Sequence, residues 1–134
     1  MNEHERHAAG MTMRRAVLGD AHVDRAAAAT TDATREFQDL LTRYAWGEIW
    51  TRPGLDLRAR RQIVIGTLVA LGRWDELVMH VRAALAESAA GALTRAEIRE
   101  ILLQQAVYCG LPAVNHAFGL VADLLAEPAA DDAR

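Results

Sequence analysis

A glutamate and a histidine near the middle of the chain have a spacing that could support acid–base chemistry. Glu76 and His80 are four residues apart, so on a helix they share one face. A carboxylate one turn before an imidazole can accept its N–H, fix its tautomer and raise its basicity. Such a pair can move protons in catalysis. Pairs with this spacing are more often solvated surface pairs, so the spacing alone does not establish catalysis.

The basic residues limit the chemistry further. All fifteen are arginine, and no lysine is present. The side chains therefore offer no amine for a Schiff base. Arginine instead supplies a planar fork that binds carboxylates through two hydrogen bonds. The composition favours a binding site for an acid over one for a carbonyl that must react with an amine.

The composition indicates one helical domain. The chain has 134 residues, of which 51% are hydrophobic and only 5% aromatic, and much of the apolar content is alanine and leucine. No apolar run is long enough to span a membrane, and the polar start at 1–6 has no signal-peptide core behind it. The single Cys109 excludes a disulfide framework, so we expect a reducing, cytoplasmic location. A net charge of −3 gives no support for nucleic-acid binding.

Glycine, proline and capping residues divide the chain into helices. Asn2, Asp20, Asp56 and Thr94 are the predicted N-caps, and Gly19, Gly72, Gly91 and Gly110 are the predicted stops. No segment alternates as a strand would. We expect one domain over 1–134, with an N-terminal arm at 1–30 and a flexible tail at 128–134. The expected helices cover residues 2–18, 20–29, 32–50, 57–71, 74–90, 94–109 and 113–126.

One predicted helix has features that call for a partner. From Ile63 to Leu71 it is apolar on nearly every side, which predicts burial all round. A small domain has little room for such a helix, so we expect subunit contacts. Its first turn holds Arg58, Arg60 and Arg61, where the helix dipole disfavours cations. That placement indicates a further role for these arginines.

Four segments resemble the gamma-carboxymuconolactone decarboxylase family of the alkyl hydroperoxidase D-like (AhpD-like) superfamily. The resemblance extends over nearly the whole chain, and the first two segments are typical of the decarboxylase branch. The resemblance implies an all-α, AhpD-like helical domain of about six helices, a ring-like homo-oligomer that is typically a hexamer, and no cofactor or metal. The segments are Arg14–Arg25, Trp46–Gly54, Glu76–Ala84 and Tyr108–Ala113.

The resemblance also implies a reaction. It is the decarboxylation of gamma-carboxymuconolactone to beta-ketoadipate enol-lactone in the protocatechuate branch of aromatic catabolism. The peroxidase branch of the superfamily carries a CxxCxxxH motif, which here falls on Arg73, Glu76 and His80. Without the two cysteines, thiol peroxidase chemistry is excluded. Cys109 lies elsewhere and is interpreted as a packed thiol.

For this reaction, the resemblance and the residue types suggest a role for each candidate side chain. His80, oriented by Glu76, is the expected proton donor. His22 is a second candidate that could reach a neighbouring subunit's site, or could instead tie down the N-terminal arm. The alternatives are a related lactone substrate and a non-catalytic oligomer that binds a small acid. The clamp for the substrate's acetate carboxylate is expected from Arg60, Arg73 or Arg25, in that order, and an apolar wall from Trp46, Trp50, Leu111 and Phe118.

Overall fold

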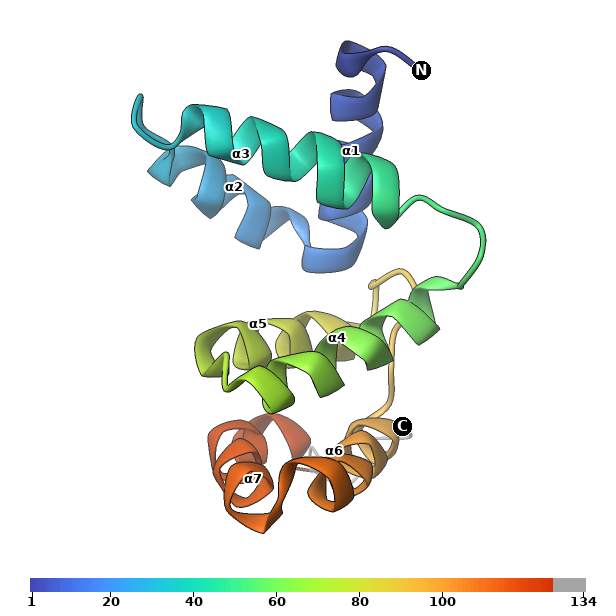
Figure 1. Ribbon diagram of the computed structural model, residues 1–134, viewed down its shortest axis with the longest axis vertical. Helices are drawn as coiled ribbons and strands as arrows, with labels where there is room; N and C mark the ends of the chain where they lie inside the picture. The colour runs from blue at the N-terminus through green and yellow to red at the C-terminus, as the bar shows by residue number, and fades with distance from the viewer. Residues whose placement is uncertain (127–134) are drawn as a thin grey trace. The chain divides into compact units, whose positions relative to one another are not determined.

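The computed structural model describes residues 1–126, and all the regular structure in that range is helical (Figure 1). This confirms the all-α prediction. Residues 1–126 form more helices than the about six that the family resemblance implies, because the expected helix over 32–50 changes from α to π geometry after Leu41. In chain order they are α1 (Glu3–Leu18), α2 (Asp20–Ala29), α3 (Arg35–Leu41), the π-helix η1 (Thr42–Ile49), α4 (Leu57–Leu71), α5 (Trp74–Leu85), α6 (Arg95–Cys109) and α7 (Leu111–Leu125).

The chain forms two compact units, Met1–Leu57 and Arg58–Arg134. The first contains α1, α2, α3 and η1, and the second contains α4 to α7. The segment 1–30, expected to be an arm, forms α1 and α2 of the first unit. The predicted tail at 128–134 lies outside the described residues. A single domain over 1–134 stays a prediction.

The first unit is built around a close crossing of α1 and η1. A Cβ added at Gly10 would lie 2.1 Å from the Thr42 carbonyl oxygen, and one at Gly47 would lie 2.3 Å from the Arg6 carbonyl oxygen. Real side chains do not approach backbone so closely, so these two positions require glycine. The crossing brings the inner face of α1 against Thr42 and so forms one wall of the first unit's interior.

Two glycines each separate consecutive helices by a single residue. Gly19 (φ 89°) lies between α1 and α2, and Gly110 (φ 92°) lies between α6 and α7. L side chains rarely adopt such a positive φ, which explains glycine at both corners. The predicted helix stops at these glycines are confirmed. The predicted cap at Asp20 is wrong, because Gly19 is the N-cap and the Asp20 carboxylate instead accepts a 3.0 Å hydrogen bond from Arg15.

The second unit has a continuous apolar core. It joins residues of α4, α5, α6 and α7 with Leu93 of the loop before α6. The spacing of Ile98, Ile101, Leu102 and Val107 along the sequence predicts that they form the buried side of α6. Ile98 and Leu102 are fully buried, whereas Val107 is 75% exposed, so the prediction is wrong for Val107. In the single chain Ile63 and Leu71 of α4 are 55% and 63% exposed, so burial on every side would require the expected subunit contacts and stays a prediction.

Two arginines in the first turns of α4 hold the loop before α6. The buried Arg61 donates from Nε and Nη2 to the Ala90 carbonyl oxygen at 3.0 and 2.9 Å. Arg58 donates to the Ala92 carbonyl oxygen and pairs with Glu97. These contacts give two of the three clustered arginines a structural role, so the cluster no longer points to a substrate site by itself.

The predicted helix over 74–90 is too long. α5 ends at Leu85, Ala86 is extended, and the following residues form a loop. The Leu93 N–H donates to the Ala84 carbonyl oxygen at 2.9 Å, which returns the chain to the end of α5. The arginine contacts to this loop favour it over the remaining five residues of the predicted helix, about one and a half turns. The capping box at the start of α6 is confirmed, because the Glu97 N–H donates to Thr94 Oγ1 and the Thr94 N–H to Glu97 Oε1.

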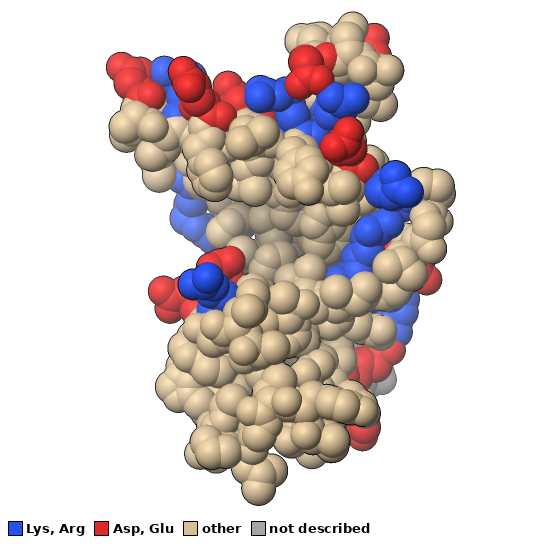
Figure 2. All heavy atoms as spheres, viewed as in Figure 1, with Lys and Arg blue, Asp and Glu red and all other residues tan. Residues whose placement is uncertain are grey.

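Parts of the second unit's surface are apolar. On the face seen in Figure 2, the surface over α6 and α7 carries few charged side chains. None of the helices formed by residues 1–126 combines the length and hydropathy needed to span a membrane. The most exposed large apolar residues of α6 and α7 are Leu103, Val107, Tyr108 and Leu111.

Candidate functional site

The predicted acid–base pair lies on α5. Glu76 is in the first turn of this helix and is exposed, and His80 is half-buried one turn later. The helical spacing of Leu77, Val81 and Leu85 predicts an apolar stripe beside this pair, and all three are buried in the core. The core fixes this side of α5, so the helix holds its outer face in a defined orientation. Carboxylates in the first turn also interact favourably with the helix dipole.

The arginines predicted to bind substrate divide between the units. Arg73 is the N-cap residue of α5, one turn before the Glu76 backbone, and makes no side-chain cap hydrogen bond. Arg60 lies on α4 and is half-buried. Both therefore belong to the same unit as His80, whereas Arg25 lies on α2 of the first unit.

The two tryptophans predicted to form an apolar wall contact each other on η1. Trp46 and Trp50 stack with ring centroids 4.9 Å apart and an interplanar angle of 22°. Trp46 is only 6% exposed, whereas Trp50 is half-buried. Trp46 therefore contributes mainly to packing in the first unit, and Trp50 has more of its surface available. Of the other two wall residues, Leu111 is exposed and Phe118 packs against the second unit's core.

His22 lies in a positively charged part of the first unit. It is half-buried on α2. Burial lowers the pKa of its imidazole, and the charges of Arg25 and Arg14 lower it further. The ring is therefore neutral at physiological pH and can accept or donate a hydrogen bond without carrying charge. This neutral state is compatible with either role predicted for His22.

Two arginines are buried, Arg14 and Arg61, which are 7% and 1% exposed. Sequence reasoning noted Arg61 only as a member of the arginine cluster at the start of α4, and it missed the role of Arg14. A signal was present for both. Arg14 follows Gly10 by four residues and precedes Val17 and Leu18, so it lies on the inner face of α1. Arg61 precedes the buried Ile65 by four residues, so it lies on the inner face of α4. A cation on the apolar face of a helix indicates a specific partner.

Two other residues singled out by type have packing partners. The His116 ring lies edge-on to Trp74 with centroids 4.7 Å apart. Cys109 is half-buried against the core and its Sγ donates to Gln105 Oε1 at 3.3 Å. This agrees with the interpretation of Cys109 as a packed thiol. In the part of the chain that the structure describes, no group of three or more His, Cys, Asp or Glu side chains is arranged to hold a metal ion.

The fold and these side chains define a class, an all-helical protein that carries a carboxylate and an imidazole one turn apart on a helix anchored in its core. The sequence model of the Carboxymuconolactone decarboxylase family matches residues 35–123, and the chain belongs to that family. The match includes Glu76 and His80 as well as Trp46 and Trp50.

Individual relatives agree with this assignment. A 4-carboxymuconolactone decarboxylase of Acinetobacter baylyi is 40% identical over 124 residues, which cover 92% of this chain and 90% of the relative. A nitrosuccinic acid decarboxylase of Metarhizium robertsii is 40% identical over 108 residues, covering 81% of this chain and 73% of the relative. A 4-carboxymuconolactone decarboxylase sequence of Pseudomonas putida is 54% identical over 48 residues, covering 36% of this chain and all of that sequence.

Proposed function

We propose that this protein decarboxylates gamma-carboxymuconolactone to beta-ketoadipate enol-lactone and carbon dioxide, in the protocatechuate branch of aromatic catabolism. The main support is the 40% identity to a 4-carboxymuconolactone decarboxylase along nearly the full length of both chains. Family membership over residues 35–123 supports the same class of reaction. The residue roles below are part of the proposal.

The reaction makes two demands on a protein. The leaving carboxylate is on the saturated ring carbon attached to the far end of a double bond that is conjugated to the lactone carbonyl. When carbon dioxide leaves, its bonding electrons move through that double bond to the carbonyl oxygen and give a dienolate. The protein must stabilise this oxyanion and then deliver a proton to the carbon beside the carbonyl. The substrate is its own electron sink, so this route needs no metal or organic cofactor.

His80 is the proposed proton donor and Glu76 the residue that positions it. Their support is the shared face of α5 and the half-buried position of His80 beside a fixed core stripe. One well-placed donor to a developing oxyanion is worth about 3–4 kcal/mol. His22 remains the alternative donor.

The test of this assignment is a paired rate and labelling experiment. His80→Ala should lower kcat by about 10²–10⁴-fold, the usual range for a general acid–base group. In deuterium oxide, the wild type should place one deuterium on a single face of the carbon beside the lactone carbonyl. Residual turnover by His80→Ala should give both faces, if the product is trapped before it exchanges. Glu76→Gln should fall between the two, because it keeps the size of the side chain and loses its charge.

The matched control is His4→Ala, an exposed histidine in the first turn of α1. It should keep the wild-type rate and single-face labelling. If His80→Ala also keeps both, His80 is not the donor, and His22→Ala becomes the variant to measure. If the wild type releases no carbon dioxide from the lactone, the proposed substrate itself is wrong.

The acetate carboxylate of the substrate needs a cation, and Arg60 is our first candidate, followed by Arg73 and Arg25. Arg60 lies in the same unit as His80 and is half-buried on α4. Arg60→Lys replaces a planar fork with a point charge, so it should raise KM more than it lowers kcat. An unchanged kcat/KM in both Arg60→Lys and Arg60→Ala would move the clamp to Arg73.

A nitro acid is the second candidate substrate, because a nitrosuccinic acid decarboxylase is also 40% identical over most of this chain. In nitrosuccinic acid one carboxyl group is attached to the carbon that also bears the nitro group. That nitro group can take up the electrons released when carbon dioxide leaves. The two reactions thus share the same demands. Parallel assays with the lactone and with nitrosuccinate decide between them through the ratio of the two kcat/KM values.

The proposed assembly is a ring-like homo-oligomer, and specifically a hexamer. Its support is the family resemblance together with exposed apolar residues on α4, α6 and α7, which include Ile63, Leu71 and Val107. Sedimentation at micromolar concentration should give a species several times the 14.7 kDa of one chain. A fully active monomer would remove the idea that subunits share a site.

Independence of metals and a cytoplasmic location complete the proposal. Treatment with EDTA should leave the rate of decarboxylation unchanged. Loss of activity that a single metal restores would overturn the metal-free route. The location rests on the single cysteine, which suits a reducing compartment, and fractionation of the native host would test it.

A further inference from the structure

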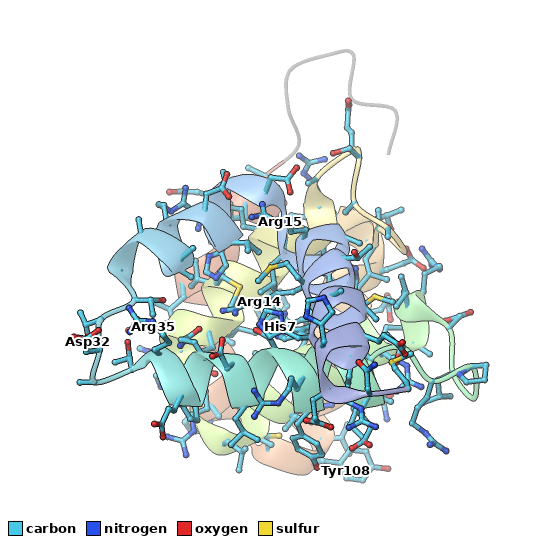
Figure 3. The ribbon with its side chains drawn as sticks, turned by 90° about the horizontal axis from the view of Figure 1, so that it is seen from above. His7, Arg14, Arg15, Asp32, Arg35 and Tyr108 are labelled. Atoms are coloured by element: carbon cyan, nitrogen blue, oxygen red, sulfur yellow. The ribbon has the colours of Figure 1, made fainter. Side chains whose placement is uncertain are left out.

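The first unit encloses a pocket that contains none of the residues assigned to decarboxylation. Its volume is about 250 Å³, and α1, α2, α3 and η1 all contribute to its walls. Figure 3 shows Arg14 and His7 on the side of α1 that faces α2 and α3, with Arg35 at the beginning of α3. The lining residues are His7, Met11, Arg14, Val23, Ala27, Thr30, Arg35, Gln38, Asp39 and Thr42.

Arg14 is the unusual member of this lining. It is only 7% exposed, and its guanidinium donates from Nη1 to Thr42 Oγ1 and from Nη2 to Gln38 Oε1, both at 3.3 Å. Its Nε is buried and has no hydrogen-bond partner. A guanidinium has five N–H donors, so two long bonds to neutral oxygens leave most of its capacity unused. Within residues 1–126, no carboxylate forms an ion pair with it.

A buried cation without a counter-ion is costly, which makes an anion the expected complement. Burial lowers the pKa of the Arg14 guanidinium, yet arginine still keeps its charge at neutral pH. The charge also acts on its surroundings, because it contributes to the lowered pKa of His22 on α2.

The other charged groups of the pocket lining each have an ion-pair partner. Asp39 Oδ1 lies 3.4 Å from His7 Nε2, and Arg35 pairs with Asp32 at 2.6 Å. Asp39 is thus the one carboxylate in the lining, and its printed ion pair is with His7 and not with Arg14. Arg14 remains the charge of the pocket that is not balanced by a contacting acid.

We propose that this pocket binds the carboxylate of a small organic acid, with Arg14 as its principal ligand and Thr42 and Gln38 as the groups that hold the guanidinium in place. The planar fork of arginine matches a carboxylate through two parallel hydrogen bonds. Pockets for drug-sized ligands start at about 300 Å³, so a volume near 250 Å³ suits an acid of a few carbons. This goes beyond decarboxylation, because the proposed site shares no residue with the candidate catalytic group on α5.

The test uses the full chain and succinate as the probe. An anion beside Arg14 should offset its field at His22, so the pKa of the His22 imidazole should rise on binding. We expect a saturable change in the His22 ring signals by NMR, with a raised titration midpoint at saturating succinate. Sodium chloride at equal ionic strength is the control for general screening and should not saturate.

Three variants test whether succinate binds in this pocket. Arg14→Met keeps an unbranched side chain of similar length and should weaken succinate binding at least tenfold. Gln38→Met removes one of the two groups that hold the guanidinium and should weaken binding several-fold. Arg82→Gln, an exposed arginine on α5, removes the same charge from the other unit and should bind succinate as the wild type does.

Circular dichroism and the dispersion of the amide signals report whether each variant is folded. If Arg14→Met fails to fold, Gln38→Met together with the wild-type His22 titration still decides the matter. No saturable effect of succinate on His22, or equal affinity in the wild type and a folded Arg14→Met, would overturn the proposal. Neither readout depends on decarboxylation, so failure here and failure of the proposed enzyme activity are distinguishable.

Discussion

Within residues 1–126, each of the two units buries one arginine, and the two arginines have opposite surroundings. Arg61 in the second unit is 1% exposed and directs Nε and Nη2 at the Ala90 carbonyl oxygen. Arg14 in the first unit is 7% exposed and contacts only the neutral side-chain oxygens of Thr42 and Gln38, at the edge of a pocket.

This difference separates a structural cation from one that is available to a ligand. A backbone carbonyl next to a fixed loop is a permanent partner, so Arg61 is part of the framework that positions α6. Side-chain oxygens at 3.3 Å leave N–H groups free for a better acceptor. A buried arginine is therefore assigned by what it contacts and not by how deeply it lies.

The largest expected effect tests the crossing that forms the wall beside Arg14. Gly10→Ala would place a Cβ 2.1 Å from the Thr42 carbonyl oxygen and 2.9 Å from the Gly47 nitrogen. Backbone cannot rotate away as a side chain can, so we expect a loss above about 3 kcal/mol, beyond the usual range for overpacking. Hydrogen exchange of the α1 and η1 amides should report the loss.

The matched control for the crossing is Gly119→Ala on α7, where a Cβ would meet nothing within 4 Å. It should stabilise the second unit by roughly 0.5–1 kcal/mol, because alanine favours the helix. If Gly10→Ala were as harmless as Gly119→Ala, the close approach of α1 and η1 would be wrong.

The next effect tests the structural arginine. Arg61→Met should cost about 2 kcal/mol, because a charge-assisted hydrogen bond is lost and the Ala90 carbonyl loses its donor. Release of the buried charge offsets part of the loss. Urea unfolding measures the change, with Arg82→Met on the exposed face of α5 as the control. Equal midpoints for the two variants would show that Arg61 does not hold the loop.

Arg14→Met should change the unfolding free energy by less than about 1 kcal/mol in the absence of an acid, because two bonds to neutral groups are lost while a costly buried charge is removed. Succinate should then stabilise the wild type by mass action and leave the variant unaffected. A loss as large as that of Arg61→Met would give both arginines the same structural role and remove the contrast between the units.

The two arginines also show what local sequence patterns can and cannot predict. Caps and stops depend on a few adjacent residues, and for that reason the Thr94–Glu97 capping box and the ends at Gly19 and Gly110 were predictable. Asp20 was misassigned because Arg15, five residues away, competes for its carboxylate. The end of α5 at Leu85 depends on Arg61 from another helix, which no local pattern contains.

The candidate sites also divide into a local pattern that the sequence contains and a tertiary one that it does not. The pair at Glu76 and His80 could be proposed from spacing, because both belong to one helix. The pocket around Arg14 could not, since its lining comes from four helical elements between His7 and Thr42. An arginine on the buried face of α1 was the only local signal, and its partners depend on tertiary packing.

The smallest expected effect concerns Glu97, the carboxylate that pairs with Arg58 and caps the start of α6. The pKa of Glu97 is lowered first by its hydrogen bond from the Thr94 backbone and less by Arg58. A carboxyl group with a lowered folded pKa stabilises the protein above its unfolded pKa, and this contribution is lost as the pH falls through the folded pKa. The loss should therefore begin near the ordinary value of 4.5 and deepen below it.

Glu97→Gln should flatten this part of a plot of urea midpoint against pH between about pH 3 and about pH 7. Glu100→Gln removes the same charge from an exposed position on α6 without touching the cap, so its curve should keep the wild-type slope. If both variants gave the same slope, the cap at Thr94 would not depend on the Glu97 charge. The contrast between the hydrogen-bonded loop of the second unit and the open pocket of the first would then not depend on that charge either.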